Sequence, residues 1–290
     1  MRGPERAAAI STVKTEHVVE QIIFADGWQA KFAESGFTGF DDFFQFSDGR
    51  PINELSRRSV QMLTLNIDSE QKTFFIKRFI NPHIKDIIFA RAHFGKFYSQ
   101  AECEWENAKL LFANGIKTYR PLCLGSQKIL GIEKNSFLVT EKLPGQPFSE
   151  FVAQNWTNLS QSQKENILTS IAKLIRKAHD AKIGITDLYI WHIFINQIQT
   201  NDVNPEYDFA VIDLHRMCHN VTNPNQLIQN LGRFHHSLRA EYFDENLKQF
   251  FIKAYAADNY AGEANKLYEQ VKNYSKKLSA KRNQKPYLHA

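Results

Sequence analysis

The order of sequence patterns along the chain predicts an α+β fold with two lobes. Between residues 59 and 141, short segments alternate apolar and polar side chains as strands do, and one helical segment interrupts them. Beyond residue 160 the apolar spacing becomes helical, apart from a small hairpin within residues 193–212. Strands followed by helices are typical of α+β proteins. We expect the two lobes to meet near residues 141–147.

The first lobe opens with a predicted hairpin. Residues 59–67 and 73–79 read as strands, and the polar residues 68–72 between them read as a turn. Residues 99–114 have the spacing of a helix that ends at Gly115, where a left-handed backbone is expected.

The remaining elements follow from the same patterns. Residues 1–20 show no clear period and are expected to be loosely organised, and a phenylalanine-rich region interrupted by glycines follows them. A strand is expected at residues 136–141, and a short hairpin at 193–195 and 209–212. Helices are expected at residues 160–181, 225–241 and 245–257.

Composition narrows the class of protein. Of the 290 residues 43% are hydrophobic and 23% charged, which excludes a mostly disordered chain. No apolar run approaches the ~20 residues of a membrane-spanning helix. The N-terminal segment is a poor secretory signal, and Cys103, Cys123 and Cys218 are widely spaced. These features predict a cytoplasmic protein with free thiols.

The basic residues are concentrated at the C-terminal end. The net charge is +5, but residues 266–290 alone carry +6, so the rest of the chain carries −1. A nearly neutral body gives no reason to expect nucleic-acid binding. The basic residues of this tail are Lys266, Lys272, Lys276, Lys277, Lys281, Arg282 and Lys285, opposed by Glu269 alone. A membrane-surface contact and a solvated chain end are equally compatible with this pattern.

Four residues of suitable chemistry occur in a significant order. Asp187 precedes the predicted hairpin of the second lobe and Asp213 follows it. Phosphoryl transfer needs one carboxylate to orient a hydroxyl and another to hold Mg²⁺ against the phosphates. Upstream, Lys77 interrupts an apolar strand, and a helix carrying Glu104 and Glu106 offers it a partner. This order matches a protein-kinase-like catalytic apparatus.

Each residue taken alone has a simpler interpretation. An aspartate after a strand is usually a turn or cap residue, and Lys77 could extend its ammonium to solvent from an edge strand. Glutamates on an amphipathic helix are usually solvated. The histidines lack the spacing of metal-binding motifs. The hypothesis therefore depends on all four residues occurring together.

Two longer strings make the interpretation specific. The sequences DLYIWHIF at residues 187–194 and VIDLHR at residues 211–216 closely resemble the bacterial lipopolysaccharide core heptose kinases, within the lipopolysaccharide (Kdo/heptose) kinase family. Smaller landmarks resemble the same family, and the resemblance extends over roughly residues 50–255. These landmarks are RRSV at 57–60, FIK at 75–77, EW at 104–105, GI at 115–116 and TE at 140–141.

The resemblance implies a two-lobed protein-kinase-like fold, with a small β-rich N-lobe and a mainly helical C-lobe. It implies an N-terminal extension at residues 1–45, an N-lobe at 46–143, a C-lobe at 144–265 and a basic tail at 266–290.

The resemblance also implies roles for individual residues. Lys77 would contact the ATP phosphates and pair with Glu104. Glu104 is preferred to Glu106 because its distance to Gly115 resembles the family pattern. Asp187 would be the catalytic base, and Asp213 the main Mg²⁺ ligand. His192 stands where protein kinases place a metal-binding asparagine, so it would belong to the metal site, either as a ligand or by hydrogen bonding to a phosphate or a metal-bound water.

The backbone of Glu141 to Leu143 would bind adenine. Arg57 and Arg58 stand where a glycine-rich phosphate loop would turn, and could reach phosphates or an anionic substrate, or form a solvated loop. Two departures stand out: no GxGxxG occurs, and residues 185–186 before the catalytic aspartate are Ile-Thr instead of His-Arg.

The resemblance thus predicts an ATP- and Mg²⁺-dependent kinase that phosphorylates a sugar hydroxyl, a heptose of the lipopolysaccharide inner core. Its partner would be the lipopolysaccharide core or a related anionic glycolipid, at the cytoplasmic face of the inner membrane. The alternatives are an aminoglycoside- or choline-type small-molecule kinase, a Kdo kinase, and a non-catalytic pseudokinase that serves as a binding module.

Overall fold

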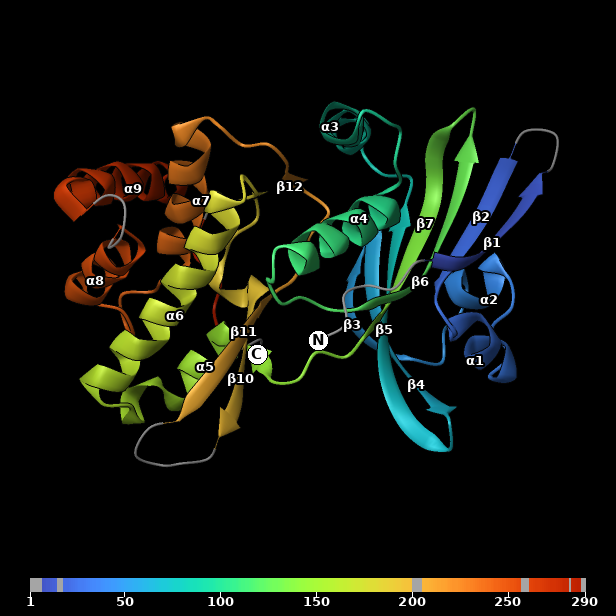
Figure 1. Cartoon of the computed structure of the whole chain (residues 1–290), viewed down its shortest axis with the longest axis horizontal. Coiled ribbons are helices and arrows are strands. Elements are labelled where there is room, and N and C mark those ends of the chain that lie inside the picture. Colours follow the sequence, from blue (N-terminus) through green and yellow to red (C-terminus); the bar gives the residue numbers. More distant parts are fainter. Residues whose placement is uncertain (1–6, 15–17, 200–204, 257–260, 282, 288–290) are drawn as a thin grey trace. The chain divides into compact units, whose positions relative to one another are not determined.

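A computed structural model describes the chain except for residues 1–6, 15–17, 200–204, 257–260, 282 and 288–290 (Figure 1). The chain divides into two compact units, the first rich in β-strands and the second mainly helical, so the predicted α+β class is confirmed. The first unit comprises Met1–Ala113, Thr118–Lys142 and Leu214–Arg216. The second comprises Asn114–Lys117, Leu143–Asp213 and Met217–Ala290.

A seven-stranded antiparallel sheet forms the first unit. The predicted hairpin is present, and its turn residues Asp68 and Ser69 both have left-handed backbones, with φ of 54° and 65°. In spatial order the strands are β1 (Ala7–Lys14), β2 (Val18–Ala25), β6 (Pro121–Ile129), β7 (Ile132–Glu141), β5 (Glu70–Ile80), β4 (Arg58–Ile67) and β3 (Arg50–Leu55). Every neighbouring pair is antiparallel.

The expectation of a loosely organised N-terminal segment is wrong for the described part of residues 1–20, and 1–6 and 15–17 lie outside the described residues. β1 and β2 pair with each other, and β2 continues the sheet by pairing with β6. Ile22 and Phe24 alternate into the core. The three alanines that open β1 have little strand propensity, whereas Ile10, Thr12 and Val13 favour a strand, and pairing with β2 extends over both halves.

Helices cover both faces of this sheet. They are α1 (Trp28–Glu34), α2 (Phe40–Phe44), α3 (Ile84–Phe94) and α4 (Gln100–Ala113). Successive strand residues point to opposite faces. On β7, Ser136 accepts a hydrogen bond from the backbone of α4, whereas the ring of Phe137 packs on Phe40 and Phe43 of α2. The glycine-punctuated phenylalanine region therefore supplies the aromatic core on the face opposite α4.

A buried carboxylate holds the N-terminal end of α4. Glu133 of β7 accepts a 2.9 Å hydrogen bond from the backbone N–H of Gln100 and a 2.5 Å bond from the hydroxyl of Ser136. Burial raises the pKa of Glu133 to about 7, and Glu102 adds to this rise. The hydrogen bonds from Ser136 and Gln100 and the charge of Lys128 oppose it.

This raised pKa predicts a pH-dependent stability. Between the ordinary pKa of 4.5 and the native value of about 7, native Glu133 keeps a proton that the unfolded chain releases. Its stabilising contribution is therefore complete below pH ~4.5 and is lost as the pH rises through ~7, by up to about 3 kcal/mol. Urea unfolding across this range should show the loss in wild type and in the exposed-site control Glu54→Gln, but not in Glu133→Gln. Parallel pH profiles for all three proteins would contradict the prediction.

The helix predicted after the first hairpin is α4, and its end is also as predicted. Gly115 follows it with φ of 63°, the left-handed conformation that glycine adopts without steric cost. Lys177 of the second unit donates to the carbonyl of Gly115 at 2.8 Å.

The second unit confirms the predicted helices within about three residues at most boundaries. Its helices are α5 (Phe148–Asn155), η1 (Trp156–Asn158), α6 (Gln161–Asp180), η2 (Ile190–His192), α7 (Pro224–Ser237), α8 (Glu245–Ala256), η3 (Ala261–Glu263) and α9 (Ala264–Ser279). Its strands are β8 (Gln146–Pro147), β9 (Gly184–Ile185), β10 (Ile193–Gln199), β11 (Glu206–Val211) and β12 (Met217–Cys218). The predicted hairpin is β10–β11, and β8 extends it.

The basic C-terminal tail includes a packed helix. Tyr268 and Val271 of α9 are buried, and α9 packs against α7 and α8. A Cβ on Gly232 of α7 would lie 2.4 Å from the ring of Tyr274, so glycine is required for this close approach. Among the described helices, none has the length and apolar character needed to cross a membrane.

Candidate active site

The first unit pairs Lys77 with Glu104. Lys77 lies on β5 and Glu104 on α4, and the ammonium contacts the carboxylate directly. The Glu104 side chain is 1% exposed and that of Lys77 is 14% exposed. The predicted pairing is thus present, whereas Glu106 bonds instead to Lys109 at 2.8 Å on the more exposed side of the helix. The neighbouring Arg78 points to the opposite face, as strand alternation requires.

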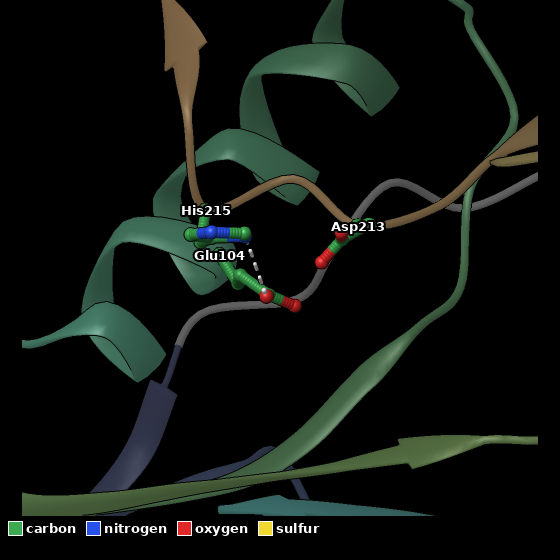
Figure 2. Close-up of side chains that lie close together, drawn as sticks. All are labelled: Glu104, Asp213 and His215. Atoms are coloured by element: carbon green, nitrogen blue, oxygen red, sulfur yellow. Dashed lines mark ion pairs between the residues drawn. The ribbon is translucent and has the colours of Figure 1, made fainter. Parts of the chain in front are cut away.

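Two residues absent from the sequence prediction complete the surroundings of Glu104. The hydroxyl of Tyr119 donates to the carboxylate, and Nδ1 of His215 lies 3.7 Å from Oε1. Figure 2 shows the Glu104 side chain directed toward the His215 ring, with Asp213 two residues earlier on the loop that carries this histidine. A buried carboxylate surrounded by donors keeps a fixed orientation, which in turn fixes the Lys77 ammonium.

The short segment that carries His215 is anchored within the first unit. Asn107 of α4 donates to the carbonyl of Leu214 at 2.7 Å, and Arg216 pairs with Asp86 of α3 at 2.9 Å. In the VIDLHR string, the residues after the aspartate are therefore bound to α3 and α4. The sequence of the string does not reveal these partners, which are more than 100 positions away.

Removing the Glu104 charge should strongly destabilise the protein. Glu104→Gln keeps the shape of the side chain but removes a 1% exposed carboxylate charge from its direct contact with the Lys77 ammonium, so we expect a loss of about 3–5 kcal/mol in the free energy of unfolding. The matched control Glu106→Gln disrupts a pair whose side chains are 34% and 38% exposed, and should cost under about 1 kcal/mol. Urea unfolding measures the free energy of unfolding of both variants. Similar losses in the two would show that burial of the Glu104 pair does not increase its contribution to stability.

Arg57 and Arg58 lie at the β3–β4 turn. Residue 57 is in the turn and its guanidinium donates to the carbonyl of Asn81, while Arg58 is the first residue of β4. A two-residue hairpin thus replaces a glycine-rich loop at this point of the sequence. Arg57 is exposed.

The predicted adenine-binding segment follows β7. Glu141 ends this strand, and its N–H donates to the carbonyl of Arg120 at 3.1 Å. Leu143 is the first residue of the next part of the second unit. Just beyond it, that unit contains a cavity of about 450 Å³ lined by Gly145, Gln146, Phe151, Asn155, Ile195 and Gln197.

The loop carrying Asp187 is supported by a small two-stranded sheet. Asp187 follows β9, and β9 pairs with β12 through Ile185–Met217 and Gly184–Cys218. The hydroxyl of Thr186 lies 3.4 Å from the sulfur of Cys218. Ile185 and Thr186, which depart from the His-Arg of similar kinases, therefore join the loop to β12 through backbone pairing and this side-chain contact.

Within the second unit, His192 contacts the backbone of Asp187 and the carboxylate of Asp213. Its Nδ1 lies 2.7 Å from the backbone carbonyl of Asp187, and its Nε2 lies 3.6 Å from Oδ2 of Asp213. Asp213 has φ of 63°, a left-handed conformation that aspartate tolerates better than most residues. The site residues of this unit are thus held by the loop backbone, the imidazole and a constrained turn.

This arrangement suits a cation. Because a carbonyl can only accept, Nδ1 of His192 must carry the proton of that hydrogen bond. The other ring nitrogen, Nε2, faces Oδ2 of Asp213 at 3.6 Å. A carboxylate oxygen is the ligand type that Mg²⁺ prefers, so Asp213 fits a magnesium ligand better than His192 does.

The comparisons with known proteins agree with the sequence motifs. Two relatives from Escherichia coli are both named lipopolysaccharide core heptose(I) kinase WaaP. The K12 protein is 26% identical over 174 residues, which cover 59% of this chain and 65% of the relative. The other is 27% identical over 170 residues, covering 58% and 62%. The match therefore spans just under two thirds of each relative's length.

A solved structure described as WaaP in complex with acyl carrier protein has the same fold. Its TM-score is 0.64 at 19% identity, and the match covers 89% of this chain and 98% of that chain. The sequence model of the lipopolysaccharide kinase (Kdo/WaaP) family matches residues 43–255, a range that includes all the predicted site residues. This chain therefore belongs to the lipopolysaccharide kinase (Kdo/WaaP) family, as its motifs predicted.

Proposed function

We propose that the protein is an ATP-dependent kinase that phosphorylates a hydroxyl of a heptose in the lipopolysaccharide inner core. The observation that carries this proposal is the family match over residues 43–255, which contains Lys77, Asp187 and Asp213 together. Both relatives are named for heptose(I) phosphorylation, which supports heptose over Kdo as the acceptor sugar.

Each residue has a role that its surroundings support. Lys77, held by the buried Glu104, positions the ATP phosphates and offsets their charge. Asp187 accepts a hydrogen bond from the sugar hydroxyl and takes its proton during in-line attack. Asp213 would supply the oxygen ligand for Mg²⁺. His192 contacts both this carboxylate and the backbone of the Asp187 loop, and so fixes their positions relative to each other. Bound Mg²⁺ would neutralise phosphate charge.

The substrate contacts are also proposals. The backbone from Glu141 to Leu143 binds adenine, and Arg57 and Arg58 bind phosphates of ATP or of the acceptor. Guanidinium groups suit both, because they bind phosphate through paired hydrogen bonds. The exposure of Arg57 leaves room for such a contact.

A product analysis tests the proposed function. The protein is incubated with Mg²⁺, ATP labelled in its γ-phosphate and a panel of lipopolysaccharide cores that end before or after the first heptose. Labelled phosphate on a heptose, located by mass spectrometry of the released core, is the expected result. Label on Kdo would reassign the sugar. Absence of label on every acceptor, despite thermal stabilisation by Mg·ATP, would instead favour a non-catalytic binding module.

We also propose contact with the cytoplasmic face of an anionic inner membrane, where a lipid-anchored substrate would reside. Lys276 and Lys277 near the end of α9 are exposed, and each basic residue near such a surface contributes about 1 kcal/mol. Replacing both with glutamate should lower binding to phosphatidylglycerol vesicles by about 30-fold or more in low salt.

The matched control reverses two exposed lysines elsewhere in the second unit, Lys173→Glu and Lys253→Glu. Cosedimentation should change much less for this control, and neutral vesicles should bind all variants poorly. Equal losses for both pairs would show that net charge alone governs binding, and no loss for either would reject a contact through α9.

A further inference from the structure

A C-terminal strap, defined here as residues 283–287, lies against the end of α7. Its last residue, Tyr287, is 5% exposed. The Tyr287 hydroxyl accepts a 2.9 Å hydrogen bond from the N–H of Arg239 and donates a 2.6 Å bond to the carbonyl of Ser237. The Tyr242 ring stacks on Tyr287 with centroids 5.2 Å apart. These contacts fix the strap on the residues that end α7.

Ser237 connects the end of α7 to the loop that carries Asp187. Its hydroxyl donates to the carbonyl of Phe234 at 2.7 Å and accepts a 2.9 Å hydrogen bond from the backbone N–H of Ile190. Ser237 is 1% exposed and Ile190 is 0% exposed, so water cannot readily replace this bond. Tyr287 therefore binds the carbonyl of the same residue whose hydroxyl holds Ile190.

Ile190 opens η2, the short turn that ends at His192. This histidine contacts the carbonyl of Asp187 and the carboxylate of Asp213, so a displacement at Ile190 would alter the contacts of both aspartates. The strap makes a second contact here, because the Lys285 ammonium lies 5.3 Å from the centroid of the Trp191 ring. The strap is thus connected to the Asp187–His192 loop indirectly, by hydrogen bonds through Ser237, and directly, by the cation–π contact with Trp191.

We propose that the C-terminal strap positions the Asp187–His192 loop for phosphate transfer, with Tyr287 and Ser237 as positioning residues. This inference rests on the proposed kinase function for its catalytic consequence. Its structural part, a connection from Tyr287 through Ser237 to the Ile190 amide, holds or fails independently. The strap part of the basic tail then positions the Asp187–His192 loop, and this role is independent of what the exposed lysines of α9 bind.

Hydrogen exchange at the Ile190 amide tests the connection without any activity. Ser237→Ala removes the hydroxyl that accepts from this N–H. Tyr287→Phe removes only the hydroxyl that donates to the Ser237 carbonyl. We expect Ile190 to exchange about 10-fold faster in Ser237→Ala and about 3-fold faster in Tyr287→Phe. A chain ending at residue 287 and the variant Tyr242→Phe, which keeps the stacked ring, are matched controls and should leave this amide unchanged.

Steady-state kinetics of the full chain tests the catalytic part. At a temperature where all variants remain folded, Tyr287→Phe should lower kcat about 10-fold and leave KM for ATP within about twofold, because a misplaced loop affects the transition state more than nucleotide binding. A purely structural role would lower thermal stability without moving kcat. Unchanged exchange at Ile190, or equal acceleration throughout α7 and α9, would overturn the proposal. If wild type transfers no phosphate, the function fails while the exchange result still decides whether the strap holds the loop.

Discussion

Asp187→Asn is expected to lower phosphate transfer by about 10²- to 10⁴-fold, the usual contribution of a positioned general base. The substitution keeps the size of the side chain but removes its ability to take the proton of an attacking hydroxyl. The contact of Asp187 with His192 uses its backbone carbonyl, which the substitution leaves in place. Loop geometry, and with it ATP binding, should therefore persist.

Two measurements separate this result from a folding defect. Thermal unfolding with and without Mg·ATP should show a similar ligand-induced shift in Asp187→Asn and wild type. The control Asp180→Asn removes an exposed carboxylate from the end of α6, in the same unit, and should transfer phosphate like wild type. Turnover of Asp187→Asn within threefold of this control would remove Asp187 from the mechanism.

The predictable parts of the fold were those with a strong local pattern. The β4–β5 hairpin alternates apolar residues across a turn, and α6 carries a regular apolar face between Ser160, its N-terminal cap, and Ala181. The pairing of Lys77 with Glu104 was predictable for a different reason. A lysine within an apolar strand needs a buried counter-charge, and the family resemblance selected which glutamate provides it.

The parts that were missed depend on contacts distant in sequence. β1 begins with three alanines, which give a weak strand signal, and its pairing with β2 includes these alanines in the sheet. The basic composition of residues 266–290 favours a membrane-surface contact or a solvated chain end, and so gives no indication that Tyr268 and Val271 form a buried face of α9 with helical spacing. Such a face could have been found by testing the tail for a period of 3.6 residues.

The candidate site shows the same division. Asp187, His192, Asp213 and His215 all lie within one recognisable pair of strings, but nothing in these strings indicates that His215 contacts Glu104. Tyr119, which also contacts Glu104, lies outside both strings. Tyrosine and histidine are common in cores, and their donor role depends on where α4 packs on the sheet. Sequence patterns thus locate the charged residues more readily than the groups that orient them.

Asp213→Asn is expected to reduce activity by about 10²- to 10³-fold, as losing one preorganised electrostatic group does, and to raise the Mg²⁺ concentration needed for half-maximal rate. Asparagine accepts the left-handed backbone of this position, whereas Asp213→Ala adds about 1–2 kcal/mol of strain. The two variants should therefore be similarly inactive but differ in stability. Activity in Asp213→Asn alone would show that backbone shape, and not charge, is what the site requires.

The effect of Mg²⁺ on stability gives a second test, which does not depend on turnover. In wild type the carboxylate of Asp213 faces Nε2 of His192, a ring whose Nδ1 already donates to the Asp187 carbonyl. An amide at position 213 keeps the size of the side chain, so urea unfolding of Asp213→Asn and of wild type with EDTA gives the baseline for each protein. Adding Mg²⁺ should then stabilise wild type but not the variant. Equal stabilisation of the variant and wild type by Mg²⁺ would leave Mg²⁺ binding at Asp213 without support.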